Sequence, residues 1–271
     1  MRARDRLAAV PSVAELIEVL AQGERWLAVN KPPRLSVHES NYTGPREQTL
    51  LRCLREQLGE KLHAIHRLDT ATSGVLLLAR DPAMAAELSQ QFESRQVRKA
   101  YLGVVRGYAP DDSLVDHPLA GAEGKGPLRE ARTVVRRIAA VEFPWAIGAF
   151  PTARYSLVVA WPETGRYHQI RRHLKHLSHP LIGDVNYGRG EHNRAFRMQL
   201  AIHRLLLHAW RLHFTDPESG QPQAVVAPWD SEFQRIIERM TPIDWEAAAA
   251  EPDPAATRGD AVAADSEPTL R

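Results

Sequence analysis

The chain has 271 residues, of which 44% are hydrophobic, 25% charged and 7% aromatic, and its formal net charge is +2. This balance is typical of a globular protein and excludes collagen-like, wholly disordered and disulfide-stapled chains, since Cys53 is the only cysteine. No apolar window approaches the roughly 18 residues of a membrane helix, and the start of the chain lacks the apolar core of a signal peptide. We therefore expect a protein of the reducing cytoplasm.

Apolar spacing, with proline and glycine at the boundaries, predicts the secondary structure. Helices are expected where apolar residues recur every three or four positions, as in the leucines before Gly59. Strands are expected where a short apolar run lies between turn residues. Asp81 and Pro82 fit the N-cap and first turn of a helix, and Cys53 falls inside another helix as a small core residue. In chain order the predicted elements are a helix at 13–20, a strand at 25–30, a helix at 48–58, a strand at 74–79, a helix from Pro82, strands at 100–105 and 155–161, and a helix at 166–177.

These elements interleave without a regular strand–helix–strand repeat, which predicts an α+β fold with a mixed sheet and not a doubly wound one. Residues 121–127 contain three glycines and are expected to form an exposed loop. Residues 246–271 carry six acidic and two basic side chains and almost no large apolar ones, so they are predicted to be a disordered acidic tail. One folded domain is therefore expected at 24–245, after an N-terminal extension at 1–23.

Positive charge is concentrated in one part of the chain. Residues 166–213 hold nine arginines and lysines against only Asp184 and Glu191, together with eight of the twelve histidines. A surface of this kind favours a polyanionic partner. The alternative is a solvated face whose charges form salt bridges with the rest of the protein.

A polar loop with one carboxylate precedes the apolar strand expected at 74–79. It reads His66-Arg67-Leu68-Asp69-Thr70-Ala71-Thr72-Ser73-Gly74. A loop held by a buried strand keeps a catalytic group both exposed and fixed, and Asp69 is the candidate for that group. The alternative is that Asp69 only caps a turn, which is a common place for a loop aspartate.

Lys99 and Tyr101 open the strand expected at 100–105. Alternate positions of a strand share one face, so the cation and the phenol are predicted to lie side by side. Such a pair suits a phosphate and a stacked base. It equally suits an ordinary strand edge.

Residues 164–177 combine an apolar helix face with cations and histidines. Arg171 and Lys175 are four positions apart on a neighbouring face, within reach of a carboxylate or of phosphates. The histidines suggest a zinc site, but their spacing matches no familiar zinc signature, so phosphate contact or packing is favoured. These histidines are His168, His173, His176 and His179.

Together these segments resemble the pseudouridine synthase family, in the branch that acts on structured ribosomal or transfer RNA. The resemblance comes from several blocks in the family's order, spread over most of residues 26–214. It favours a functional interpretation of Asp69, Tyr101 and Arg171. Arg34 departs from the pattern, because relatives usually have a glycine at this place. The blocks are Val29-Asn30-Lys31-Pro32 with Val37-His38, His66 to Gly74, Lys99-Ala100-Tyr101, Thr164 to His173, and Leu206-Leu207-His208-Ala209.

The resemblance implies a catalytic domain with a largely antiparallel mixed sheet, and a reaction that needs no cofactor and no metal. It assigns Asp69 as the catalytic carboxylate, Arg171 as its ion-pair partner, and Tyr101 as the residue that stacks on uracil and removes its C5 proton. Leu207 is expected on the other side of the base, and Arg67 in the space that a flipped uridine vacates. Contacts with RNA phosphates are expected from Lys31, Lys99, Arg172 and Lys175.

Within the family, residues 151–155, 171–180 and 193–194 most resemble members that modify the T-stem of transfer RNA, at position 65. A structured RNA, and transfer RNA in particular, is therefore the expected partner of a monomeric enzyme. Alternatives are a ribosomal RNA target, a protein that binds or folds RNA without catalysis, and a metal-dependent hydrolase built on the histidines. Whether the aspartate attacks C1′ or acts as a base at C2′ stays open.

Overall fold

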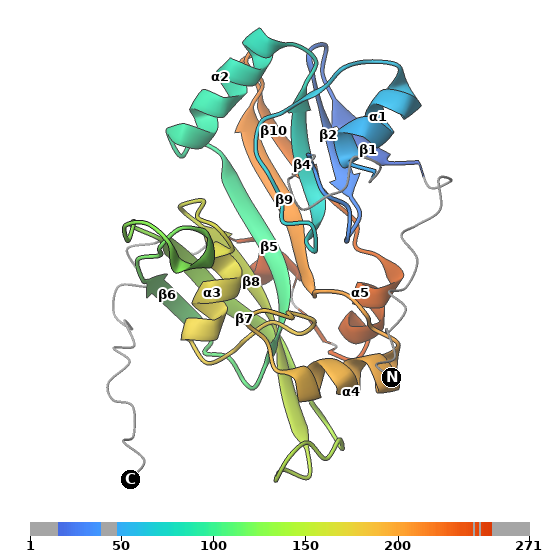
Figure 1. The fold of residues 1–271 in the computed structure, drawn as a ribbon, viewed down its shortest axis with the longest axis vertical. Helices are drawn as coiled ribbons and strands as arrows, with labels where there is room; N and C mark the ends of the chain where they lie inside the picture. Colours follow the sequence, from blue (N-terminus) through green and yellow to red (C-terminus); the bar gives the residue numbers. More distant parts are fainter. Residues whose placement is uncertain (1–15, 39–47, 241, 244, 251–271) are drawn as a thin grey trace, which may run out of the picture.

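The computed structural model describes residues 16–38, 48–240, 242–243 and 245–250 (Figure 1). The strands are β1 (Glu18–Gln22), β2 (Trp26–Lys31), β3 (His63–Ala64), β4 (Ser73–Ala79), β5 (Arg98–Arg106), β6 (Asp112–Asp116), β7 (Arg132–Phe143), β8 (Ala153–Pro162), β9 (Leu207–Thr215) and β10 (Pro222–Val226). The helices are α1 (Leu50–Leu58), α2 (Pro82–Glu93), α3 (Gln169–His176), α4 (Gly190–Leu200), α5 (Ser231–Ile237) and α6 (Trp245–Ala249), with a short 3₁₀ helix, η1 (Ala122–Gly124).

All ten of these strands belong to one sheet. Its order is β1-β2-β4-β9-β5-β8-β7-β6, with β10 beside β9 and β3 beside β4. Strands β4 and β9 run parallel, whereas the other pairs among the described strands run antiparallel. The predicted α+β class, with a mixed and largely antiparallel sheet, is confirmed.

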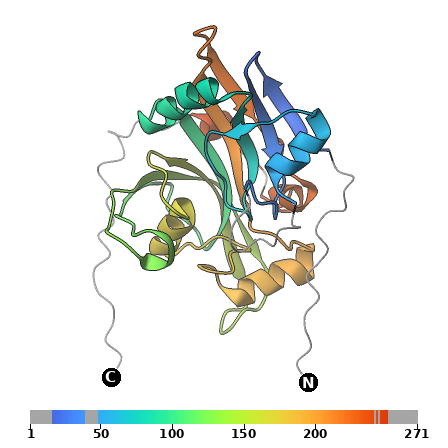
Figure 2. The same ribbon diagram turned by 45° about the horizontal axis from the view of Figure 1, so that its top comes forward.

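Alternate residues of a strand point to opposite faces of the sheet, and different helices cover these two faces. In β9, Leu207 and Ala209 belong to the apolar clusters that include α3 and α1. Trp210 and Leu212 belong to the clusters on the other face, which include α4 with α5 and α2. In Figure 1, α1 and α2 flank the upper half of the sheet, and α3 and α4 flank the lower half. Figure 2 shows α1 and α3 in front of the strands.

Most of the predicted elements are present, and their ends follow the expected signals. Helix α1 ends at Gly59, which has the left-handed conformation that glycine favours (φ 74°). Helix α2 begins after Asp81, whose side chain accepts hydrogen bonds from the backbone of Ala83 and Met84. Cys53 is only half-buried, at the edge of the core that α1 covers. The loop predicted at 121–127 contains only η1 and is exposed where its side chains are described.

Two expectations about the ends of the fold are wrong. The helix predicted at 13–20 is contradicted over its described part, because Glu18–Gln22 forms a strand that pairs with β2. The tail predicted to be disordered from residue 246 begins with helix α6, in which Ala248 is fully buried in the core. Residues 1–15 and 251–271 lie outside the described residues. Among the described helices, none is long and apolar enough to cross a membrane.

Candidate active site

A cavity of about 750 Å³ opens on the face that α1 and α3 share. Tyr101 lies where the apolar clusters beneath these two helices meet, and it forms part of the cavity wall. The remaining wall comes from the loop before β4, the end of α2, Leu207 at the start of β9, and residues 162–171. Six residues predicted for the site line this cavity, namely Arg67, Asp69, Lys99, Tyr101, Arg171 and Leu207.

The loop that carries Asp69 is fixed at both ends. Its far end enters β4, in which every residue is buried. Just before β4, the Thr72 backbone N–H donates to the Asp69 carbonyl at 3.0 Å. His66 accepts a hydrogen bond from the Leu77 backbone through Nε2 at 3.1 Å, which ties the start of the loop to β4. The loop therefore meets the condition of being held by a buried strand, and Asp69 has a side chain that is 24% exposed.

Lys31 is also part of this support, and the predicted phosphate contact at Lys31 is wrong. Its side chain is completely buried, and Nζ donates to the carbonyls of Pro32, Leu35 and Thr70 at 2.9, 2.8 and 3.2 Å. A cation enclosed by three carbonyl groups cannot reach RNA. It fixes the residue next to Asp69 instead.

Arg171 joins Asp69 to a second carboxylate, Asp184, to which the sequence motifs assign no role. Its Nη1 donates to Asp69 Oδ2 at 3.1 Å, and its Nε and Nη2 form a bidentate pair with Asp184 at 2.7 and 2.9 Å. Burial opposes the charge of the guanidinium, but the hydrogen bonds and charges of Asp184 and Asp69 outweigh burial and raise the pKa of Arg171. The arginine is therefore a permanent cation in a fixed orientation.

Asp184 is in turn held by backbone donors. Its carboxylate accepts hydrogen bonds from the N–H groups of Asn186 and Tyr187 at 2.9 and 3.0 Å. Burial works against its charge, yet Arg171 and these donors together lower the pKa of Asp184. The available signal in the sequence was that Asp184 is one of only two acids in the basic stretch 166–213.

Tyr101 and Leu207 both face the cavity from the central strands β5 and β9. Burial, together with the charge of Asp69, raises the pKa of Tyr101. The phenol is therefore protonated in the free protein, which suits stacking, and it can accept a proton only after its own has left. Lys99 lines the same cavity, with its Nζ 6.0 Å from the centre of the Phe92 ring.

The cations predicted to hold RNA take different places. Arg67 is exposed at the cavity wall, which leaves its guanidinium available to a substrate. Lys175 is exposed on α3 and does not line the cavity. Arg172 is half-buried, and its Nη1 donates to the Ala120 carbonyl at 2.6 Å. The RNA contacts of Lys99, Arg172 and Lys175 stay predictions.

The four histidines considered for zinc do not converge. His173 bonds to Thr133 and to the His117 carbonyl, and His179 bonds to the Arg106 carbonyl. His168 is the member that lines the cavity. Among the described residues, no group of three histidine, cysteine, aspartate or glutamate side chains is placed to hold a metal ion.

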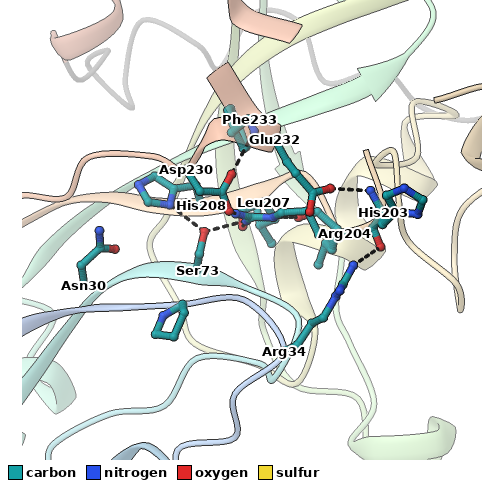
Figure 3. Close-up of polar contacts among 12 residues, drawn as sticks. Asn30, Arg34, Ser73, His203, Arg204, Leu207, His208, Asp230, Glu232 and Phe233 are labelled. Atoms are coloured by element: carbon teal, nitrogen blue, oxygen red, sulfur yellow. Dashed lines mark hydrogen bonds and ion pairs between the residues drawn. The ribbon is translucent and has the colours of Figure 1, made fainter. Parts of the chain in front are cut away.

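A buried polar network supports the cavity from behind (Figure 3). Arg204 donates from Nη2 to Ser73 Oγ at 2.6 Å and to the Leu207 carbonyl at 3.1 Å, and its Nη1 pairs with Asp230. Ser73 in turn contacts His208 Nδ1 at 2.7 Å. This network ties the end of the Asp69 loop to the cavity wall at Leu207. Arg204 and Arg171 were both counted in the basic stretch, but both are buried, so less of that charge reaches the surface than the sequence implied.

Arg34, the departure from the family pattern, has φ 66°. This is the left-handed conformation that favours glycine, which explains why a glycine is usual at such a turn. Here the side chain compensates by donating from Nη2 to the His203 carbonyl at 2.7 Å, as Figure 3 shows.

Comparisons with known proteins agree with this geometry. Residues 25–176 match the family model for RNA pseudouridylate synthase. The chain is 42% identical over 232 residues to the tRNA pseudouridine synthase C of Pectobacterium carotovorum, covering 82% of this chain and 61% of that protein. It is 41% identical over 240 residues to the protein of the same name from Pasteurella multocida, covering 85% of this chain and 97% of that protein.

Solved structures show the same fold. Human RNA Pseudouridylate Synthase Domain Containing 1 superimposes with a TM-score of 0.69 at 24% identity, covering 91% of this chain and 100% of that one. Human RNA Pseudouridylate Synthase Domain Containing 4 gives a TM-score of 0.64 at 25% identity, covering 82% of this chain and 92% of that one. With a family match over more than half of its length and relatives above 40% identity, this chain belongs to the RNA pseudouridylate synthase family.

Proposed function

We propose that the chain converts a uridine in the T-stem of transfer RNA, at position 65, to pseudouridine, with Asp69 as the catalytic carboxylate. The observation that carries this proposal is the Asp69–Arg171 pair in the wall of a cavity rich in cations. Five arginines and lysines line the cavity against three carboxylates, which suits the phosphates of RNA.

The reaction is an isomerisation and needs no redox partner. The N1–C1′ bond of uridine breaks, the uracil turns while it stays bound, and a C5–C1′ bond forms. The proton lost from C5 is balanced by the proton that N1 gains. Asp69 either attacks C1′ or removes the C2′ proton, and both routes require an ionised carboxylate beside the ribose.

The neighbouring side chains have separate roles in this proposal. Arg171, held by Asp184, keeps the Asp69 carboxylate aimed at the ribose. Tyr101 stacks on the uracil and passes its hydroxyl proton to N1, so that as a phenolate it can accept the C5 proton once the base has rejoined the ribose. Leu207 packs against the other side of the ring. Because burial raises the pKa of Tyr101, it becomes a base only after its own proton has left.

A uridine inside a stem reaches this cavity only after it leaves the base stack, which costs a few kcal/mol. Arg67 is exposed at the cavity wall and fills the vacated space. Phosphate contacts from Lys99, Arg172 and Lys175 offset the cost, and such contacts weaken strongly as salt rises.

Support for transfer RNA as the substrate comes from relatives at 36–42% identity named tRNA pseudouridine synthase C. A transfer RNA substrate places the enzyme in the cytoplasm, where we propose that it acts as a monomer. Ribosomal RNA is the alternative target, and RNA binding without catalysis is the alternative function.

Mapping of pseudouridines in RNA from cells that lack the gene tests the proposed substrate. We expect one T-stem pseudouridine to disappear from transfer RNA and to return with a plasmid copy of the gene. Loss of a pseudouridine from ribosomal RNA alone would point to the alternative target. An unchanged map in both RNA classes would point to binding without catalysis.

A further inference from the structure

His168 lies beside Asp69 and has no part in the function proposed above. It precedes α3 with φ 52°, in the left-handed region where non-glycine residues are uncommon, although histidine is enriched there together with asparagine and aspartate. Its side chain is only 10% exposed and lines the cavity. Backbone strain of this kind persists where the surrounding structure enforces it, often at functional sites.

Two polar contacts define the orientation of the ring. Nδ1 lies 3.1 Å from the Tyr187 hydroxyl, and Nε2 lies 3.6 Å from Asp69 Oδ2. Tyr167 stacks on the ring with centroids 3.7 Å apart. The distance from Nε2 to Asp69 is longer than that of a hydrogen bond, but catalytic hydrogen bonds are often long in free enzymes and shorten when substrate binds.

Electrostatics selects one tautomer of this imidazole. Burial lowers the pKa of His168, and the charge of Asp69 only partly opposes this shift, so the ring is neutral near pH 7. A lone pair on Nε2 would face the Asp69 carboxylate, which is repulsive, so the proton resides on Nε2 and Nδ1 accepts from the Tyr187 hydroxyl.

We propose that His168 is a positioning residue for Asp69: its Nε2–H holds Oδ2 together with Arg171 and leaves Oδ1 to face the ribose. Among the described residues, Asp69 Oδ1 accepts no hydrogen bond, whereas Oδ2 already accepts one from Arg171. Tyr187 fixes the tautomer and so belongs to the same chain of contacts. The inference rests on the proposed function, because it requires Asp69 to act on the ribose.

Three substitutions at His168 separate this role from a structural one. His168→Gly relieves the strain at φ 52°, and His168→Asn suits the same backbone, but neither side chain reaches Asp69. His168→Gln places an amide N–H as many bonds from Cα as the imidazole Nε2. Tyr187→Phe keeps the ring over Arg171 and removes only the hydroxyl that fixes the tautomer.

The measurements are kcat and KM on a transfer RNA transcript, with the melting temperature of each variant. We expect His168→Gly and His168→Asn to lose about 100-fold in kcat with little change in KM, as a small misplacement of a reacting group can do. His168→Gln should recover to within about tenfold of the natural enzyme, and Tyr187→Phe should lose about tenfold.

Folded Gly and Asn variants with kcat within about threefold of the natural enzyme would overturn the proposal, as would full activity in Tyr187→Phe. If His168→Gly and His168→Asn both fail to fold, the activity of Tyr187→Phe decides whether the proposal holds. Asp69→Asn, assayed beside them, separates the two claims. An inactive Asp69→Asn with active His168 variants contradicts only the role of His168, whereas turnover by Asp69→Asn contradicts the proposed function itself.

Discussion

The orientation of Asp69 depends on a guanidinium that two carboxylates share. Arg171 forms its two shortest hydrogen bonds with Asp184 and a third with Asp69. The buried pair with Asp184 therefore fixes Arg171, whereas Asp69 is the proposed catalytic carboxylate. Breaking such a buried pair by removing one partner costs about 3–5 kcal/mol, because the other charge is left uncompensated. Asp184 therefore acts on the position of Asp69 through Arg171.

The sequence predicted the chemical groups of the site but not all of the contacts between them. Asp69, Tyr101 and Arg171 were found through motif blocks, and all three line the cavity. Asp184 and His168 were not assigned, since their partners depend on contacts between residues that only the folded chain brings together. Lys31 was misassigned for a related reason, because its motif does not reveal that the side chain is enclosed by three carbonyls.

Arg67→Ala tests the proposed flipping role at the level of one residue. The side chain is exposed at the cavity wall, so its removal should leave folding intact. We expect kcat/KM to fall about tenfold or more on a T-stem substrate, in line with an unstacking cost of a few kcal/mol, and much less on an RNA whose target uridine is already unpaired. Equal losses on the two RNAs, measured by pseudouridine formation, would contradict the flipping role.

At the scale of elements, local signals predicted helix ends well and pairing poorly. Gly59 and Asp81 mark the end of α1 and the start of α2 as expected. Residues 13–20 suggested a helix, but Glu18–Gln22 pairs with β2, and such tertiary pairing overrides local propensity. The single parallel pair in the sheet order, β4 with β9, joins residues more than 130 positions apart in the sequence. No local sequence pattern indicates this pairing.

Gly74 and Gly59 form a matched pair that tests the contact between β4 and β9. Both have positive φ, but a Cβ at Gly74 would lie 2.2 Å from the Ala209 carbonyl oxygen, whereas a Cβ at Gly59 would meet nothing within 4 Å. We expect Gly59→Ala to lower the free energy of unfolding by about 1 kcal/mol. Gly74→Ala should lower it by about 3 kcal/mol or more, because strain and a backbone clash add. Equal losses in urea denaturation would contradict the close approach of the two strands.

At the scale of the whole molecule, the folded part extends beyond the limits predicted from the sequence. Strand β1 precedes residue 24, and α6 extends past residue 245 with Ala248 fully buried. We propose that the catalytic domain spans at least residues 16–250. Composition predicted a disordered tail from residue 246, but it does not reveal that Ala248 and Ala249 belong to the same apolar cluster as Trp245.

Two buried histidines make the stability of the whole protein depend on pH. Burial lowers the pKa of His173 to about 4 and that of His208 to about 4. Between these values and about 6.5, the unfolded chain binds protons that the folded protein does not bind, so stability falls as the pH falls. As the pH falls from 7 to 5.5, we expect each histidine to lower the free energy of unfolding by about 1 kcal/mol.

Urea denaturation at the two pH values measures this loss, and His208→Asn is its control. This variant removes one titrating group, so its loss between pH 7 and pH 5.5 should be smaller by about 1 kcal/mol than that of the natural protein. An identical loss in both proteins would show that His208 does not titrate as its burial predicts.

In the proposed reaction, the Asp69 carboxylate acts on the ribose of a uridine in RNA. Purified Asp69→Asn tests this role most directly, through release of tritium from C5 of labelled uridine in a transfer RNA transcript, together with the Kd for the same RNA. We expect a Kd within about threefold of the natural enzyme's and no detectable release, since the amide cannot serve as nucleophile or base. Sustained release of tritium by Asp69→Asn, with pseudouridine formed at the T-stem, would contradict this role.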